Sequence, residues 1–261
     1  MSNTIALTLV QFDPVWEDSY RNMEILNGII DKIPIATDLI ILPEMFLTGF
    51  SMNVNFISQK MDGEGVTWMI NKAIEKKTTV IGTIAIKDNN KIYNRLLVIN
   101  PFGEVKWYDK RHLFRMADEH KFFDQGNSKI FVRIKDWNVL PLVCYDLRFP
   151  VWSRNVNCQY DLLVYVSNWP ESRRDAYLTL LKARAIENVC YVAAVNRTGK
   201  DKLDIDYAGD SVIIDPKGNI IADLSEKISG LINCTIELNK LQSFRQKFPS
   251  YLDADEFTIS T

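Results

Sequence analysis

Cys144, Glu44 and Lys110 are three residues whose types together can perform covalent chemistry, and each directly follows a short apolar or strand-like run. Cys144 ends the run at 139–143, and polar residues follow it at once. Ligand sites in open α/β sheets form beyond the carboxyl ends of strands, so the three side chains are expected to converge. The set would supply a base, a cation and a nucleophile.

The expected roles follow from ordinary side-chain chemistry. A cysteine with its usual pKa of about 8.5 is mostly a thiol at neutral pH, so it needs a base or a cation to become a nucleophile. Glu44 in a partly desolvated cleft would take that proton and later protonate a leaving amine. Lys110, together with the backbone N–H of Tyr145, would stabilise the oxyanion of a tetrahedral intermediate.

Each of these residues also has an ordinary structural interpretation. A cysteine in an apolar run is most often inert core. Glu44 can be a solvated loop carboxylate, and Lys110 stands in a run of charges that a solvated surface would also explain. Glu119 lies in the long segment between Lys110 and the next expected strand at Ile130, where surface charge is the alternative to function.

The bulk composition narrows the class of protein. The chain has 261 residues, 47% hydrophobic content and a formal net charge of -2, so it can bury a large core and shows no basic bias typical of nucleic-acid binding. No apolar stretch approaches the length of a membrane span, and the first four residues lack the basic region of a signal peptide. Four cysteines without C-x-x-C spacing favour reduced thiols and a cytoplasmic location.

Short apolar runs alternate with amphipathic helical patterns along the whole chain, which predicts a single α/β domain over residues 1–261. Strands are expected at 5–12, 38–42, 78–86, 92–99, 104–109, 137–144, 161–167, 190–195, 211–215, 220–224 and 231–237. Helices are expected at 18–33, 65–77, 172–188 and 238–247, with Ser172 as the N-cap of the third. Two hairpin turns argue against a purely parallel sheet, and so many strands favour two stacked sheets with helices outside.

Three blocks of sequence, in this order, resemble the signature blocks of the nitrilase superfamily of carbon–nitrogen hydrolases. They are Leu42-Pro43-Glu44, Tyr108-Asp109-Lys110-Arg111-His112-Leu113-Phe114 and Leu142-Val143-Cys144-Tyr145-Asp146-Leu147-Arg148-Phe149-Pro150. The resemblance runs from the first strand to the last helix, and it is greatest to the bacterial omega-amidases.

This resemblance implies a four-layer α-β-β-α sandwich, usually a homodimer, with Glu119 as a second glutamate that orients the lysine. It also implies hydrolysis of a small-molecule amide by water through a thioester at Cys144. An omega-amidase acts on 2-oxoglutaramate or 2-oxosuccinamate and releases ammonia and the 2-oxo dicarboxylate. No cofactor, metal, nucleic acid or membrane is implied.

The group that binds the substrate carboxylate is the least defined part of this hypothesis. A dianionic product needs a cation or several hydrogen-bond donors. The arginines near the signature blocks are Arg115, Arg148, Arg173 and Arg174. The residues predicted to contact substrate are Tyr145, Arg148, Trp169, Arg115 and Phe122.

Several alternatives remain open at the level of sequence. A Cys–His–Asp hydrolase would have to use His112 or His120, and neither lies in a recognisable partner motif. A metal site from His112, Asp118, Glu119 and His120 lacks the usual ligand spacing. The segment 62–65 lacks the third glycine of a dinucleotide-binding loop. A binding or scaffold protein on the same fold, or an enzyme that transfers the acyl group to an amine, would carry the same motifs.

Overall fold

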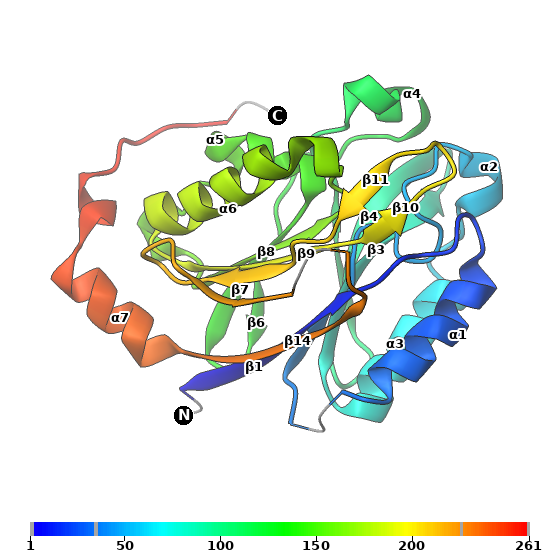
Figure 1. Cartoon of the computed structure of the whole chain (residues 1–261). Helices are drawn as coiled ribbons and strands as arrows, with labels where there is room; N and C mark the ends of the chain where they lie inside the picture. The colour runs from blue at the N-terminus through cyan, green and yellow to red at the C-terminus, as the bar shows by residue number, and fades with distance from the viewer. Residues whose placement is uncertain (1–2, 34–35, 225–226, 260–261) are drawn as a thin grey trace.

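The molecule consists of two β-sheets packed face to face, with helices on both outer surfaces (Figure 1). The computed structural model describes residues 3–33, 36–224 and 227–259. Met1 and Ser2, which belong to the segment considered for a signal peptide, lie outside the described residues. Within the described ranges, the chain forms two six-stranded sheets and one separate two-stranded ribbon. The predicted four-layer sandwich is confirmed.

The first sheet carries Glu44 and Lys110 at strand exits. Its strands, in spatial order, are β14 (Gly230–Glu237), β1 (Thr4–Gln11), β2 (Leu39–Ile41), β3 (Thr79–Asp88), β4 (Lys91–Ile99) and β5 (Val105–Asp109). β1, β2 and β3 run parallel, whereas β4 is antiparallel to both β3 and β5. The carboxyl ends of β2 and β5 therefore point to the same edge of the sheet.

The second sheet carries Cys144 in a matching position. Its strands, in spatial order, are β13 (Ile220–Asp223), β12 (Val212–Ile214), β9 (Tyr191–Asn196), β8 (Leu162–Ser167), β7 (Trp137–Val143) and β6 (Val132–Ile134). β7, β8 and β9 are parallel neighbours. The ribbon of β10 (Thr198–Lys200) and β11 (Asp206–Ala208) follows directly after β9.

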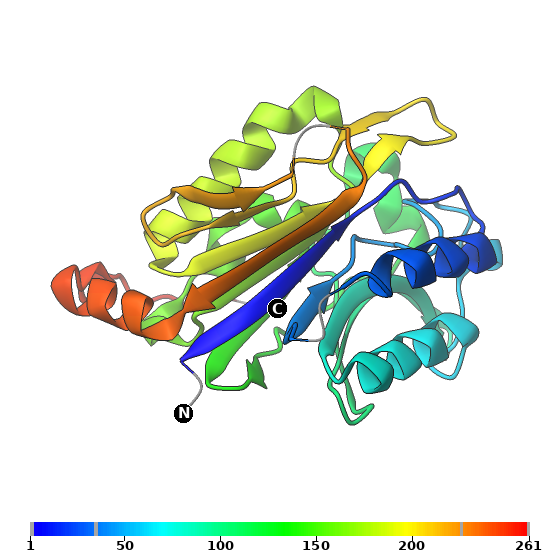
Figure 2. The same ribbon diagram turned by 60° about the horizontal axis from the view of Figure 1, so that its bottom comes forward.

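The longer helices cover the outer faces of the two sheets. α1 (Ser19–Ile30) and α3 (Glu64–Lys76) pack on the first sheet, and α6 (Arg174–Asn188) packs on the second, as Figures 1 and 2 show from two directions. The C-terminal helix α7 (Leu238–Lys247) lies beyond one end of the sandwich. The remaining α-helices are single turns: α2 (Val54–Ile57), α4 (Glu119–Phe122) and α5 (Pro150–Ser153).

Of the three apolar clusters among the described residues, the two largest hold these layers together. The larger joins the facing surfaces of the sheets, where Leu7 and Leu9 of β1 belong to the same buried cluster as Val164 and Ala193 of the second sheet. The smaller lies between the first sheet and α1 and α3. Because β1 to β3 and β7 to β9 are buried on both faces, they read as continuous apolar runs rather than alternating ones.

The predicted long elements are confirmed, with boundaries that differ by a few residues. The N-cap at Ser172 is wrong: residues 171–173 form a 3₁₀ turn, so α6 begins at Arg174 and its N-cap is Arg173. The ribbon β10–β11 and the one-turn helices were not predicted from the sequence, because elements of three or four residues are too short to show a period. Within the described part of the chain, no helix has the length and apolar character needed to cross a bilayer.

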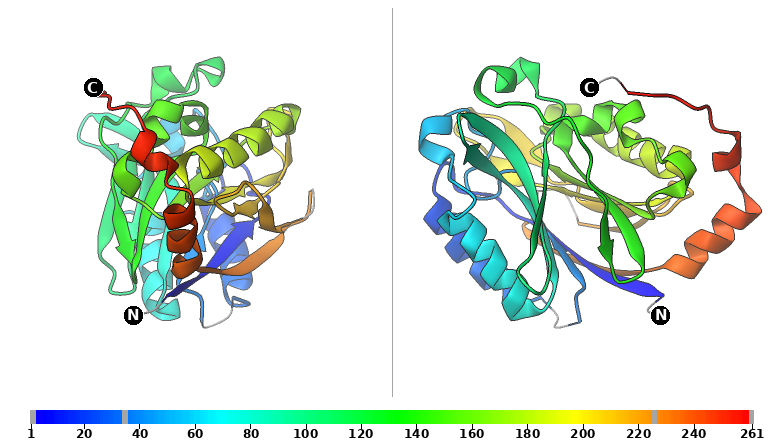
Figure 3. Two further views of the ribbon diagram at one scale, coloured as in Figure 1. Left: turned by 90° about the vertical axis from the view of Figure 1, so that its left-hand side faces the viewer. Right: turned by 180° about the vertical axis from the view of Figure 1, so that it is seen from behind.

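The two sheets bring their strand exits to one region of the molecule. Figure 3, which includes the view from behind, shows the loop after β5, with α4, beside the turn that follows β7. Antiparallel pairing places Arg95 of β4 opposite Asp109 of β5, so Asn94 lies beside Lys110 at the same edge. This arrangement determines which side chains can meet Cys144.

Candidate active site

One cleft reaches the sulfur of Cys144. It lies where the strand exits meet, and most of the side chains that surround it are apolar or cationic. Its lining consists of Phe50, Lys110, Phe114, Cys144, Tyr145, Arg148, Asn168, Trp169, Pro170 and Arg173.

Cys144 occupies a sharp turn between β7 and a 3₁₀ helix, Cys144–Arg148. Its φ of 40° lies in the left-handed region, which costs a residue with a Cβ roughly 1–2 kcal/mol. The buried carboxylate of Asp146 accepts the backbone N–H of Val143 at 3.0 Å and so helps to hold the turn. A strained backbone that is fixed in this way presents the thiol at the base of the cleft.

Lys110 lies between two buried carboxylates. Its Nζ is 2.8 Å from Oε1 of Glu44 and 3.0 and 2.9 Å from the two carboxylate oxygens of Glu119. All three side chains are at most 1% exposed. The structure therefore brings together the three charged groups that the sequence suggested, from two strand exits and one loop.

Asn94 is a fourth member of this cluster that sequence reasoning missed. Its Nδ2 donates to Oε1 of Glu44 at 2.8 Å and to Oε1 of Glu119 at 3.2 Å. Its backbone carbonyl accepts the N–H of Lys110 at 3.1 Å. The only sequence signal was an asparagine inside the expected strand at 92–99, and that signal does not name a partner. The structure shows that this asparagine is fully buried, where a polar side chain needs hydrogen-bond partners.

Glu44 is also fixed from the second sheet. Its Oε2 accepts the backbone N–H of Asn168 at 2.9 Å, and its backbone carbonyl accepts the Asn168 side-chain amide at 2.6 Å. On the other side, the N–H of Met45 donates to the Thr83 hydroxyl at 2.6 Å, and Met45 has a φ of 44°. These contacts leave the Glu44 carboxylate little freedom to rotate away from the cleft.

The charges of the cluster determine its protonation. Burial alone would lower the pKa of Lys110, but the negative charges of Glu119 and Glu44 outweigh it, so the pKa is raised and the ammonium persists. Burial raises the pKa of the Glu119 carboxyl, against the opposing effect of Lys110. Burial likewise raises the pKa of the Cys144 thiol well above its usual range, and Glu44 raises it further, while Lys110 opposes. The resting sulfur is therefore a thiol next to a potential base.

His112 belongs to a separate network. Its Nδ1 lies 2.7 Å from Oδ1 of Asp146, and its ring stacks on Phe149 with a centroid separation of 3.7 Å. The other oxygen of Asp146 accepts the hydroxyl of Tyr108 at 2.7 Å. Burial is the largest cause of the raised pKa of the Cys144 thiol, and Glu44, which hydrogen-bonds to the thiol, raises it further. Because Glu44 is in contact with the sulfur and His112 is paired with Asp146, the contacts favour Glu44 over His112 as the base.

The residues considered for a metal site do not gather. Glu119 faces Lys110, Asp118 pairs with Lys121 at 3.0 Å on the surface, and His112 faces Asp146. Among the residues that the structure describes, no group of three or more histidine, cysteine or acidic side chains is arranged to hold a metal ion.

Three of the five predicted substrate contacts, Tyr145, Arg148 and Trp169, line the cleft. Arg115 does not reach it: this arginine begins a 3₁₀ turn and is exposed. Phe122 is 43% exposed, because Glu119 and Phe123 occupy the inward face of the same short turn. Arg173, which the sequence offered only as one of several arginines, is in the lining.

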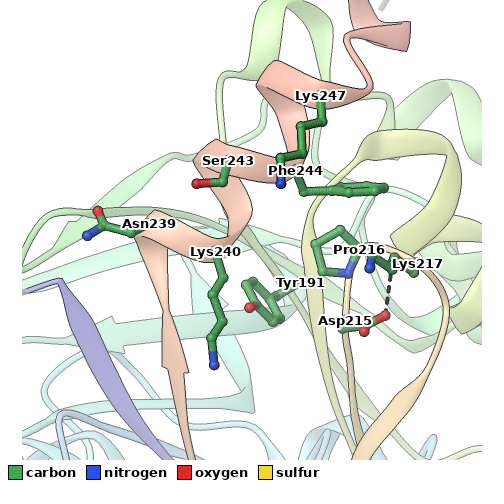
Figure 4. A pocket seen from close by; sticks show the side chains of 9 residues that line it. All are labelled: Tyr191, Asp215, Pro216, Lys217, Asn239, Lys240, Ser243, Phe244 and Lys247. Carbon is green, nitrogen blue, oxygen red and sulfur yellow. Dashed lines mark hydrogen bonds between the residues drawn. The ribbon is translucent and has the colours of Figure 1, made fainter.

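A second hollow lies between α7 and the β12–β13 turn (Figure 4). Lys217, Lys240 and Lys247 surround it, and Lys240 pairs with Glu237 at 2.6 Å. Tyr191, in its wall, is the first residue of β9 and therefore lies at the opposite end of the sheet from Cys144. Its lining contains no cysteine, and among the described residues no hydrogen bond joins Ser243 to a base, so we assign the chemistry to the cleft at Cys144.

Comparison with known proteins identifies the family of the chain. A family model described as carbon-nitrogen hydrolase matches residues 6–246. The chain belongs to the carbon–nitrogen hydrolase family. The solved structure of XC1258 from Xanthomonas campestris, a CN-hydrolase superfamily protein with an arsenic adduct in its active site, superposes on this carbon–nitrogen hydrolase with a TM-score of 0.96. That comparison has 37% identity and covers 98% of this chain and 99% of the other.

Two curated relatives of this carbon–nitrogen hydrolase carry names that state an activity. The omega-amidase YafV of Escherichia coli (strain K12) is 44% identical, over 98% of both chains. A 2-oxoglutaramate amidase of Bacillus subtilis (strain 168) is 31% identical, over 95% of this chain and 96% of the relative.

The backbone at Cys144 leads to a first prediction. Alanine normally stabilises a protein relative to glycine, but at a left-handed position glycine avoids a penalty of about 1 kcal/mol or more. We expect Cys144→Gly to be at least as stable as Cys144→Ala in urea unfolding, the reverse of the usual order. A clearly more stable alanine variant would mean that the turn is not strained.

The electrostatics of the cluster lead to a second prediction. Glu44→Gln removes the negative charge that, together with burial, raises the pKa of the Cys144 thiol, and it replaces a carboxylate acceptor by a neutral amide. Thiolate absorbance at 240 nm should therefore appear at lower pH in Glu44→Gln than in the native enzyme. For each protein, the absorbance of the same protein with Cys144→Ala is subtracted, which removes the contribution of the other three cysteines. An unchanged or higher midpoint would contradict the arrangement.

Proposed function

We propose that this protein is an omega-amidase, which hydrolyses the terminal amide of 2-oxo acid amides such as 2-oxoglutaramate and 2-oxosuccinamate. The observation that carries the proposal is a buried Glu44–Lys110–Glu119 cluster beside Cys144 in a chain 44% identical to an omega-amidase over nearly its full length. The family accounts for amide hydrolysis, and the named relatives support the 2-oxo acid amide as substrate.

In the proposed mechanism, the sulfur of Cys144 attacks the amide carbon while its proton moves to Glu44. Nζ of Lys110 and the backbone N–H of Tyr145, at the start of the 3₁₀ helix, stabilise the negative charge on the amide oxygen. The tetrahedral intermediate collapses when Glu44 returns the proton to the leaving nitrogen. Ammonia departs, and a thioester remains on Cys144.

Water completes the cycle in a second half-reaction. Glu44 removes a proton from a water molecule, which attacks the thioester carbon and releases the 2-oxo dicarboxylate and the thiol. Glu119 and Asn94 act as positioning residues, because Glu119 binds the ammonium of Lys110 and Asn94 donates to the carboxylate of Glu44. The homodimer and the cytoplasmic location that the resemblance and composition suggest remain predictions.

Ammonia release from a panel of amides tests the substrate. Purified protein should release ammonia from 2-oxoglutaramate and 2-oxosuccinamate with a higher kcat/KM than from glutamine, asparagine or a simple nitrile. Cys144→Ala should abolish release and remain folded by circular dichroism. A preference for glutamine or the nitrile over both oxo-amides would overturn the assignment.

Intact-mass spectrometry tests the role of Glu44. After mixing with a substrate amide, the native enzyme should show a mass increase at Cys144 that matches the acyl group. Glu44→Gln should show none, because a glutamine amide cannot accept the thiol proton. Glu104→Gln, the same substitution at an exposed glutamate, serves as the control. A normal acyl-enzyme in Glu44→Gln would assign the base to another residue.

A further inference from the structure

Two guanidinium groups line the outer part of the cleft without an acidic partner. Arg148 stacks over the ring of Trp169, with its Cζ 4.9 Å from the ring centroid. Arg173 lies over the ring of Phe114 at 5.5 Å, and its Nη2 is 2.8 Å from the sulfur of Met116. Within the described residues, neither guanidinium forms an ion pair with a carboxylate. Contacts with an aromatic ring or a thioether stabilise a guanidinium less than an ion pair with a carboxylate does.

The two arginines are held as one unit. The indole N–H of Trp169 donates to the backbone carbonyl of Arg173 at 2.8 Å, and the same indole carries the guanidinium of Arg148 on its face. The backbone N–H of Trp169 in turn donates to Asn196 at the end of β9 at 2.7 Å. Both side chains are half-buried and each guanidinium already lies over an aromatic ring, so part of the binding geometry exists before a ligand arrives.

The charges of the cleft favour one class of substrate end group. Its described lining contains three cationic side chains and no carboxylate. The nearby carboxylates of Glu44 and Glu119 are fully buried and already paired with Lys110. A substrate carboxylate would find unpaired guanidiniums, whereas an α-ammonium group would lie among cations with no acidic partner.

We propose that Arg148 and Arg173 together bind the substrate's carboxylate and exclude an α-ammonium group, so they are the residues that select a 2-oxo acid amide over an amino acid amide. This inference rests on the proposed function and assigns its specificity to two side chains. The 2-oxo group of the substrate can bind to the same two arginines, because guanidinium N–H groups donate to neutral carbonyl oxygens as well as to carboxylates.

The test compares Arg148→Met and Arg173→Met with the native enzyme on three amides. These are 2-oxoglutaramate, glutamine, and 4-oxopentanamide, in which a methyl group replaces the carboxylate. Each variant should lose about tenfold to a hundredfold in kcat/KM on 2-oxoglutaramate, the range for a charged hydrogen bond, and change less than about threefold on 4-oxopentanamide. Arg133→Met, which removes an arginine that is 68% exposed, should change neither.

The preference for the oxo acid gives a second readout. In the Arg148→Met/Arg173→Met double variant, the ratio of kcat/KM for 2-oxoglutaramate over glutamine should fall by at least tenfold. Equal losses on 2-oxoglutaramate and 4-oxopentanamide would overturn the role of the arginines and leave the omega-amidase assignment intact. A native enzyme that hydrolyses 4-oxopentanamide as well as 2-oxoglutaramate would likewise overturn the role of the arginines, because the carboxylate would then not be recognised. A native preference for glutamine over 2-oxoglutaramate would overturn the proposed function itself.

Binding without turnover separates recognition from catalysis. In a Cys144→Ala background, calorimetry should show tight binding of 2-oxoglutaramate and about tenfold to a hundredfold weaker binding when Arg148 or Arg173 is also replaced by methionine. Unchanged affinity in both variants would contradict the proposal, even if their turnover fell.

Discussion

The ion pairs of Lys110 with Glu44 and Glu119 are the constraint on which the rest of the site depends. An ammonium and two carboxylates are all but removed from water, and the loss of hydration costs several kcal/mol per ion unless the partners are well placed. The structure meets this cost with further donors: Asn94 to both carboxylates and backbone N–H groups to each of them. Any shift of the β5 exit, the β2 exit or the α4 loop would leave a buried charge unpaired.

A second buried carboxylate ties the nucleophile turn to the loop that carries the lysine. Asp146 accepts the N–H of Val143 on one side and the N–H of His112 on the other, at 3.0 and 3.1 Å. Burial and the charge of Asp146 raise the pKa of Tyr108, so its hydroxyl remains a donor to this carboxylate. Cys144 and Lys110 are thereby fixed relative to each other through groups that do not face the cleft.

The strand exits could be predicted from the sequence, but the contacts that hold the side chains at those exits could not. Cys144, Glu44 and Lys110 could be found because each directly follows an apolar or strand-like run, and parallel strands bring such positions to one edge. Asn94 and Asn168 act through amide contacts between strands far apart in the chain, and no local pattern identifies the partner of an amide. Arg115 and Arg173 look equivalent in sequence and both lie in 3₁₀ turns, but Arg115 is exposed, whereas the turn after Trp169 places Arg173 in the lining of the cleft.

The distribution of charge explains how a neutral thiol can serve an anionic substrate. Burial and, after it, the negative charge of Glu44 raise the pKa of the Cys144 thiol, which favours the thiol over the thiolate. A thiolate would repel an incoming carboxylate, whereas a thiol does not. In the proposed complex, the guanidiniums of Arg148 and Arg173 beside Trp169 would bind the anion at the outer end of the cleft. The substrate would then lie with its carboxylate at these arginines and its amide at Cys144, where the thiol proton can move to Glu44.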